Sequence, residues 1–260
     1  MTRSLPLLAP EGASATVSCA YTDAGTPGPA ENVLAISAND EEVDAAAISR
    51  HGGEIGVSDD RTITPVACSG GTPTVANVDA IAFSGATGTS LAIDERAGAF
   101  APGATDEGDG ASEIEFSIAW DDDGFLAVNG QPGGNRLSLG ATPAGLGLDL
   151  VGGGAPPDVD AALTNVSFVV ARGSAERDTL SAIGATPFAG PFERDVALDG
   201  KGGGDRLRGG PLEDDLIGGK GRDRIDARDG ERDQVDCGRG GDRVKADRRD
   251  RLAGCERVRL

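Results

Sequence analysis

Aromatic residues are scarce in this chain. Of its 260 residues, seven are Phe, one is Trp and one is Tyr, whereas 41 are Gly. Few side chains are therefore large enough to fill a deep core, and aromatic platforms for stacking sugars are nearly absent. We expect thin layers of small aliphatic side chains rather than the core of an ordinary enzyme.

Histidine and long apolar runs are also lacking. His51 is the only histidine and no Cys-x-x-Cys motif occurs, which argues against a zinc site. No Ser or Cys nucleophile signature accompanies His51, so we interpret it as an exposed turn residue and not as a general base. No run of 18 apolar residues exists, so we expect no membrane span. The first ten residues contain no h-region of a signal peptide, which leaves the route of export open.

Basic residues are outnumbered by acidic ones, 24 to 43, which gives a net charge of −19. Such a charge repels phosphate, so it argues against nucleic acid and anionic membranes as partners and favours cations. The excess is uneven, because residues 1–198 carry 28 acidic and 8 basic residues and residues 199–260 carry 15 and 16. The chain thus has two electrostatic regimes with a boundary near Leu198.

Each regime contains one pair of cysteines. Cys19 and Cys68 fall in the first regime, and Cys237 and Cys255 in the second. This distribution favours two local disulfides and an oxidising, extracellular compartment. The alternative is four reduced, buried thiols in a cytosolic protein.

The C-terminal regime is repetitive. Written in nines it reads GKGGGDRLR (200–208), GGPLEDDLI (209–217) and GGKGRDRID (218–226), and looser copies follow to residue 253. Glycine opens each unit, Asp stands sixth and an aliphatic residue stands eighth. A three-residue strand with one inward aliphatic side chain cannot bury that side chain alone, so the units must stack on one another. The sixth-position residues are Asp205, Asp214, Asp223, Asp233, Asp242 and Asp250.

These units resemble the RTX, or haemolysin-type, nonapeptide repeat, Gly-Gly-x-Gly-x-Asp-x-aliphatic-x. Only 218–226 matches at every position, since Lys201 and Leu212 replace glycines in the other two. The resemblance covers a quarter of the chain and implies a parallel β-roll in which two nonapeptides form one coil. Turns 18 residues apart would then stack and share a calcium ion, with Asp205 over Asp223 and Asp214 over Asp233.

Glycine turns followed by Asp suit calcium, which prefers six to eight oxygen ligands and tolerates flexible geometry. Glycine supplies the positive φ that such turns require. In residues 227–260, where Arg becomes frequent, an ion-free cap held by Arg–Asp pairs competes with calcium binding. The predicted metal-binding residues are Asp205, Asp214, Asp223, Asp233, Asp242, Gly200, Gly202, Gly209, Gly218, Gly219 and Gly221.

The first 198 residues consist of short alternating runs between turn residues, which predicts an all-β region. Residues 77–85 and 165–173 align at an offset of 88 residues, which favours irregular coils of a parallel β-solenoid over a sandwich. Residues 40–49 are the one candidate helix. The carboxylate clusters at 106–113 and 121–123 lack EF-hand spacing, and we interpret them as solvated loops in preference to calcium sites.

The sequence therefore predicts an all-β parallel solenoid whose irregular N-terminal coils continue into an RTX-like roll. Its parts are a cap (1–76), irregular coils (77–198), and the roll with its C-terminal cap (199–260). We expect a secreted calcium-binding protein with a structural or adhesive role and no enzymatic activity. The first alternative is a module that binds an extracellular glycan or surface protein and uses calcium structurally. The second is a β-helix enzyme acting on polysaccharide.

Overall fold

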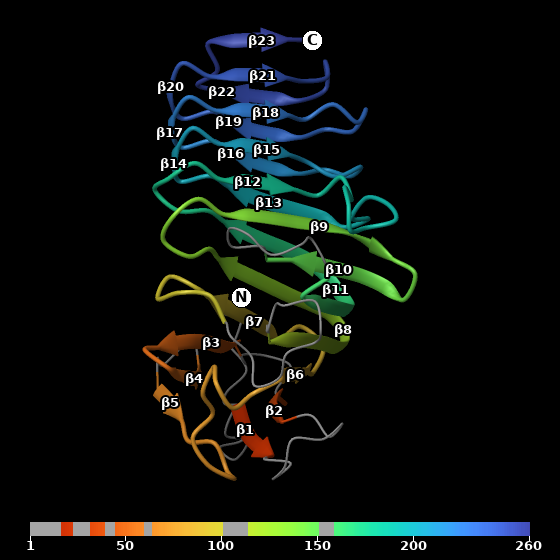
Figure 1. Ribbon diagram of the computed structural model, residues 1–260. Coiled ribbons are helices and arrows are strands. Elements are labelled where there is room, and N and C mark those ends of the chain that lie inside the picture. Colours follow the sequence, from red (N-terminus) through yellow and green to blue (C-terminus); the bar gives the residue numbers. More distant parts are fainter. Residues whose placement is uncertain (1–16, 23–31, 40–44, 60–63, 101–113, 151–158) are drawn as a thin grey trace, which may run out of the picture.

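The computed structural model describes residues 17–22, 32–39, 45–59, 64–100, 114–150 and 159–260. Within these ranges every regular element is a β-strand, and 20 strands belong to one continuous, largely parallel sheet (Figure 1). A further three short strands form a separate sheet. This confirms the all-β prediction and is compatible with a β-solenoid. No helix in the described ranges is long and apolar enough to cross a membrane.

The N-terminal strands combine antiparallel hairpins with parallel pairs. β1 and β2 are antiparallel, as are β3 with β4 and β4 with β5, whereas β6 and β7 pair in parallel with β2 and β3. The helix predicted for 40–49 is wrong where it is described, because residues 45–49 form the start of β3. Residues 40–44 lie outside the described residues. The strands are β1 (Val17–Thr22), β2 (Val33–Ala38), β3 (Ala45–His51), β4 (Glu54–Asp59), β5 (Thr64–Val66), β6 (Ala80–Gly85) and β7 (Ser90–Asp94).

Two long strands form the middle of the sheet. The first half of β8 pairs with β6 and its second half with β7, and β11 lies parallel to both halves of β8. Of the two segments aligned at an offset of 88 residues, one becomes β6 and the other the second half of β11. The strands of this part are β8 (Glu115–Asn129), β9 (Arg136–Thr142), β10 (Gly145–Asp149), β11 (Ala161–Arg172) and β12 (Thr179–Ser181).

The repeat segment adds two rows of three-residue strands to this sheet. Row A contains β12, β15, β18, β21 and β23, and row B contains β13, β16, β19 and β22, all parallel within a row. Row B joins the second half of β11 through β13, so strand pairing continues across the boundary near Leu198. The strands are β13 (Asp195–Asp199), β14 (Gly202–Gly203), β15 (Arg206–Arg208), β16 (Asp215–Ile217), β17 (Lys220–Gly221), β18 (Arg224–Asp226), β19 (Gln234–Asp236), β20 (Arg239–Gly240), β21 (Arg243–Lys245), β22 (Arg251–Ala253) and β23 (Arg257–Arg259).

One aliphatic side chain per strand builds the core of the repeat segment. In row A, Leu207 lies in register with Ile225, and Ile225 with Val244, and all three are at most 2% exposed. Leu216 and Val235 do the same in row B. Each buried side chain contributes about 1.5–3 kcal/mol, so a unit gains stability only when neighbours cover it.

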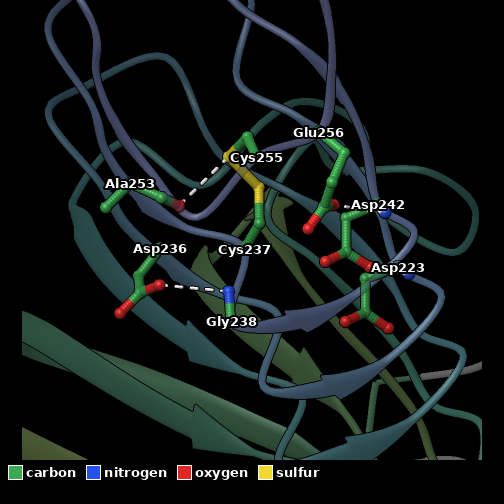
Figure 2. Close-up of a disulfide and its surroundings, with 8 residues drawn as sticks. All are labelled: Asp223, Asp236, Cys237, Gly238, Asp242, Ala253, Cys255 and Glu256. Carbon is green, nitrogen blue, oxygen red and sulfur yellow. Dashed lines mark hydrogen bonds between the residues drawn. A yellow bond between two sulfur atoms is a disulfide. The ribbon is translucent and has the colours of Figure 1, made fainter.

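Both predicted disulfides are present. Cys19 is bonded to Cys68, and Cys237 to Cys255. Figure 2 shows the second bond, which connects the turn after β19 to the segment after β22. It therefore ties the last two units of the repeat segment together.

Replacing both Cys237 and Cys255 by Ser is expected to lower the free energy of unfolding by about 3 kcal/mol, because the bond closes a loop across a sequence separation of 18. Guanidinium unfolding of the full chain under oxidising conditions measures this loss. A reductant should then destabilise the variant less than the parent protein. Equal stability of variant and parent would show that the final units need no covalent tie.

Candidate functional site

The turns of the repeat segment stack along two edges. The first edge consists of residues 200–205, 218–223 and 237–242, which connect row B to row A and contain β14, β17 and β20 as a three-stranded parallel sheet. The second edge consists of residues 209–214, 227–233 and 246–250, which connect row A to row B. Each turn ends in one of the sixth-position Asp residues.

The Asp carboxylates form a hydrogen-bonded ladder along both edges. On the first edge, Asp223 Oδ1 accepts the backbone N–H of Asp205 at 2.8 Å, and Asp242 Oδ1 accepts that of Asp223 at 2.8 Å. On the second edge, Asp233 Oδ1 accepts the N–H of Asp214 at 2.9 Å. The structure thus stacks Asp205 on Asp223 and Asp214 on Asp233, as the spacing predicted.

The second oxygen of most of these carboxylates has no hydrogen-bond partner. Oδ2 is buried and unsatisfied in Asp205, Asp223, Asp233 and Asp242. All four side chains are at most 1% exposed. A buried carboxylate oxygen without a donor is costly, so four in one segment require a proton or a cation.

Asp214 differs from the other four. Its Oδ1 accepts the N–H of Val196 at 3.0 Å and its Oδ2 that of Gly210 at 2.6 Å. Both oxygens are therefore satisfied by the protein, and this turn, in which Leu212 replaces a glycine, offers no open carboxylate oxygen.

The predicted glycines leave room for these carboxylates and for close stacking. A Cβ on Gly200, Gly209 or Gly218 would lie 2.5–2.8 Å from Oδ2 of the Asp in the same turn. Gly202 and Gly221 lie in β14 and β17, and a Cβ on Gly219 would lie 2.3 Å from the carbonyl oxygen of Lys201 one unit away. The turns thus approach one another more closely than any side chain allows.

Several turn carbonyls also bond between units. On the first edge, the carbonyl oxygens of Lys201, Gly203 and Gly219 accept backbone N–H groups from the next turn at 2.7–3.3 Å. A carbonyl oxygen has a second lone pair, so these bonds leave acceptor capacity beside the carboxylates. Among the described residues, no group of three or more His, Cys, Asp or Glu side chains is placed to hold a metal ion, so any site here depends on backbone oxygens.

Burial and like charges raise the pKa values of the ladder carboxyls. Burial raises the pKa of Asp205 to about 7, and the charges of Asp223 and Asp178 act in the same direction. Burial likewise raises the pKa of Asp214 to about 7 and that of Asp233 to about 8, and it raises the pKa of Asp223. Near neutral pH these groups therefore exchange readily between a proton and another cation.

The first-edge ladder extends beyond the predicted residues. Asp178 Oδ1 accepts the N–H of Asn135 at 2.6 Å, and Asp205 Oδ1 accepts that of Asp178 at 2.8 Å. At the other end, Glu256 Oε2 accepts the N–H of Asp242 at 2.9 Å, and Figure 2 shows its carboxylate in line with those of Asp242 and Asp223. The signal for all three was a polar residue two positions before an inward aliphatic, as in Asn135-Arg-Leu, Asp178-Thr-Leu and Glu256-Arg-Val.

The other residues considered from the sequence lie apart from this ladder. Asp121, Asp122 and Asp123 are exposed on β8. The cluster at 106–113 lies outside the described residues. His51 is exposed at the end of β3, where its Nε2 lies 3.1 Å from Ser49 Oγ.

The fold and the site together define a class of protein, an all-β chain of largely parallel stacked strands with a ladder of buried carboxylates along its turns. No family model, no curated protein and no solved structure matches the chain. The function therefore has to be argued from the ladder itself.

Proposed function

We propose that the chain is a secreted β-solenoid whose repeat segment is an RTX-like calcium-binding β-roll with a structural or adhesive role. The observation that carries the proposal is the set of unpartnered, buried Oδ2 atoms of Asp205, Asp223, Asp233 and Asp242. Calcium would supply the positive charge that these oxygens lack. The two disulfides support an oxidising environment outside the cell.

The residues fit calcium unevenly. Asp205, Asp223 and Asp242 on the first edge, and Asp233 on the second, each offer one free carboxylate oxygen beside turn carbonyls. Asp214, predicted as a ligand, offers none, because Val196 and Gly210 use both of its oxygens. We therefore assign calcium binding mainly to the first edge, with Asp214 as a structural rung.

The expected affinity is that of an extracellular calcium module, with a Kd of about 10⁻⁴–10⁻³ M. At about 2 mM free calcium and a Kd of about 0.1 mM, each site would stabilise the fold by about 1.8 kcal/mol. Below micromolar calcium the buried carboxylates repel one another and the turns loosen. Calcium would thus order and stiffen the segment once the chain reaches the extracellular medium.

Replacing Asp223 by Asn is expected to weaken calcium binding at its site about tenfold or more, because the variant loses a charged oxygen ligand. The asparagine keeps an oxygen for the N–H of Asp205, so the ladder stays closed. Calorimetric titration of the EGTA-treated full chain with calcium measures the number of sites and their affinities.

The matched control is Asp214 replaced by Asn. One side-chain oxygen is lost from two hydrogen bonds, so we expect a loss of stability of about 1–3 kcal/mol with calcium affinity unchanged. If the parent chain binds no calcium near millimolar concentrations, or if the two variants lose affinity equally, the proposed sites are wrong.

A further inference from the structure

One outward face of the repeat segment carries an uninterrupted column of arginines. In row A, Arg206 lies in register with Arg224, Arg224 with Arg243, and Arg243 with Arg257, and all four are exposed. Neighbouring strands in a sheet lie about 4.8 Å apart, so the column presents a positive charge at each step.

A second column lies beside it on the same strands. It contains Arg208, Asp226, Lys245 and Arg259 in register. Lys245 and Arg228 form ion pairs with Asp226 at 3.2 and 3.0 Å. Within the described ranges, no ion pair involves the arginines of the first column. The face as a whole carries seven basic residues and one acidic residue.

This charge pattern is unfavourable for the folded chain by itself. Like charges directly opposite each other on neighbouring strands are destabilising. The chain has almost twice as many acidic as basic residues, so composition does not account for a purely basic column. The opposite face, row B, mixes signs, with Asp215, Gln234 and Arg251 in one column. The arginines of row A therefore call for an external anion.

The shape of the face fits an elongated ligand. A groove of about 430 Å³ lies over row A, between the side chains of the two columns. Its walls include Arg206, Arg224 and Arg243 on one side and Arg208 and Lys245 on the other. Guanidinium groups bind carboxylates through paired hydrogen bonds, so a chain with regularly spaced carboxylates would satisfy several arginines at once.

The geometry points to this groove as a binding site for a linear acidic polysaccharide, a polymer with a carboxylate on its successive sugars. The inference goes beyond calcium binding, because the groove lies on the strands and not on the turn edges. Residues 199–260 contain no aromatic residue, so the face lacks the stacking surfaces with which proteins bind single-stranded nucleic acid. Charge alone would hold the polymer, and its carboxylates would remove the repulsion within the column.

The test is binding of a short oligogalacturonate to the full chain at about 2 mM free calcium, with far-ultraviolet circular dichroism to show that each variant is folded. Replacing both Arg224 and Arg243 by Gln is expected to weaken binding about tenfold or more, since each loses charge-assisted hydrogen bonds. The matched control replaces Arg239 and Arg251 by Gln. These two exposed arginines lie off the face, so the control has the same net charge and should bind as the parent does.

Equal weakening by both double variants would reduce the effect to overall charge and overturn the proposal. Stronger binding of a short DNA duplex than of the oligogalacturonate, or equal binding of a neutral malto-oligosaccharide, would overturn the assigned ligand. Repeating the titration on the Asp223→Asn variant separates the two functions. Unchanged oligogalacturonate binding there is expected even when calcium binding is weakened.

A stability measurement tests the premise of repulsion. Without ligand, the variant lacking Arg224 and Arg243 is expected to melt at the same temperature as the parent or higher. A lower melting temperature would mean that the column stabilises the fold by itself, and the case for an external anion would fail.

Discussion

Replacing Gly221 by Ala is expected to destabilise the repeat segment by more than about 4 kcal/mol, in the range reached only by severe clashes. A Cβ at this position would lie 1.4 Å from the carbonyl oxygen of Gly203, one unit earlier. That oxygen also accepts the N–H of Arg222 at 3.3 Å, so neither turn can move away without breaking the contact between units. Calcium removes none of this clash, and the loss should appear with calcium and with EGTA.

Gly230 is the matched control. It has a positive φ of 99°, as Gly221 has one of 141°, but a Cβ there would meet no atom within 4 Å. Replacing Gly230 by Ala should therefore cost only the backbone strain, about 1–2 kcal/mol. Guanidinium unfolding of both variants measures the difference. Losses within about 1 kcal/mol of each other would mean that the turns do not stack as closely as described.

The repeat segment could be predicted from sequence because one spacing determines its structure. Asp followed two residues later by an aliphatic places one side chain inward per strand, and stacking at 18 or 19 residues is the arrangement that buries it. The same rule, applied to Asn135, Asp178 and Glu256, would have found the ends of the ladder. What spacing could not indicate is which carboxylate oxygens stay free, since that depends on whether a turn N–H such as that of Gly210 points at the Asp.

The N-terminal part was less predictable for two physical reasons. The cluster Asp121-Asp122-Asp123-Gly124 has the composition of a turn, yet β8 continues through it, because a bend and a chain reversal use the same residues. The Ala-rich segment before His51 favours a helix locally, but it pairs with β4 and β7, and tertiary pairing overrides a weak propensity. Local signals located the elements there but not their continuity.

Without calcium, the protein is expected to be more stable at pH 5 than at pH 8. Burial raises the folded-state pKa of Asp205 and Asp214 to about 7 and that of Asp233 to about 8, far above the unfolded value of about 3.9. Between these values the folded chain binds more protons than the unfolded chain, so stability falls as the pH rises. Because about 1 kcal/mol moves the melting temperature of a chain this size by roughly 2–4 °C, we expect a drop of about 5 °C or more.

With about 2 mM calcium the trend should shrink or reverse. Calcium requires the ionised carboxylates, so it binds better at pH 8 than at pH 5 and releases protons as it binds. Melting temperatures at both pH values, in EGTA and in calcium, form the four measurements needed. Replacing Asp233 by Asn should flatten both trends, because the asparagine neither takes up a proton nor offers a charge. A pH dependence that is the same with and without calcium would separate the raised pKa values from metal binding, and the ladder would then be a proton-holding structural element alone.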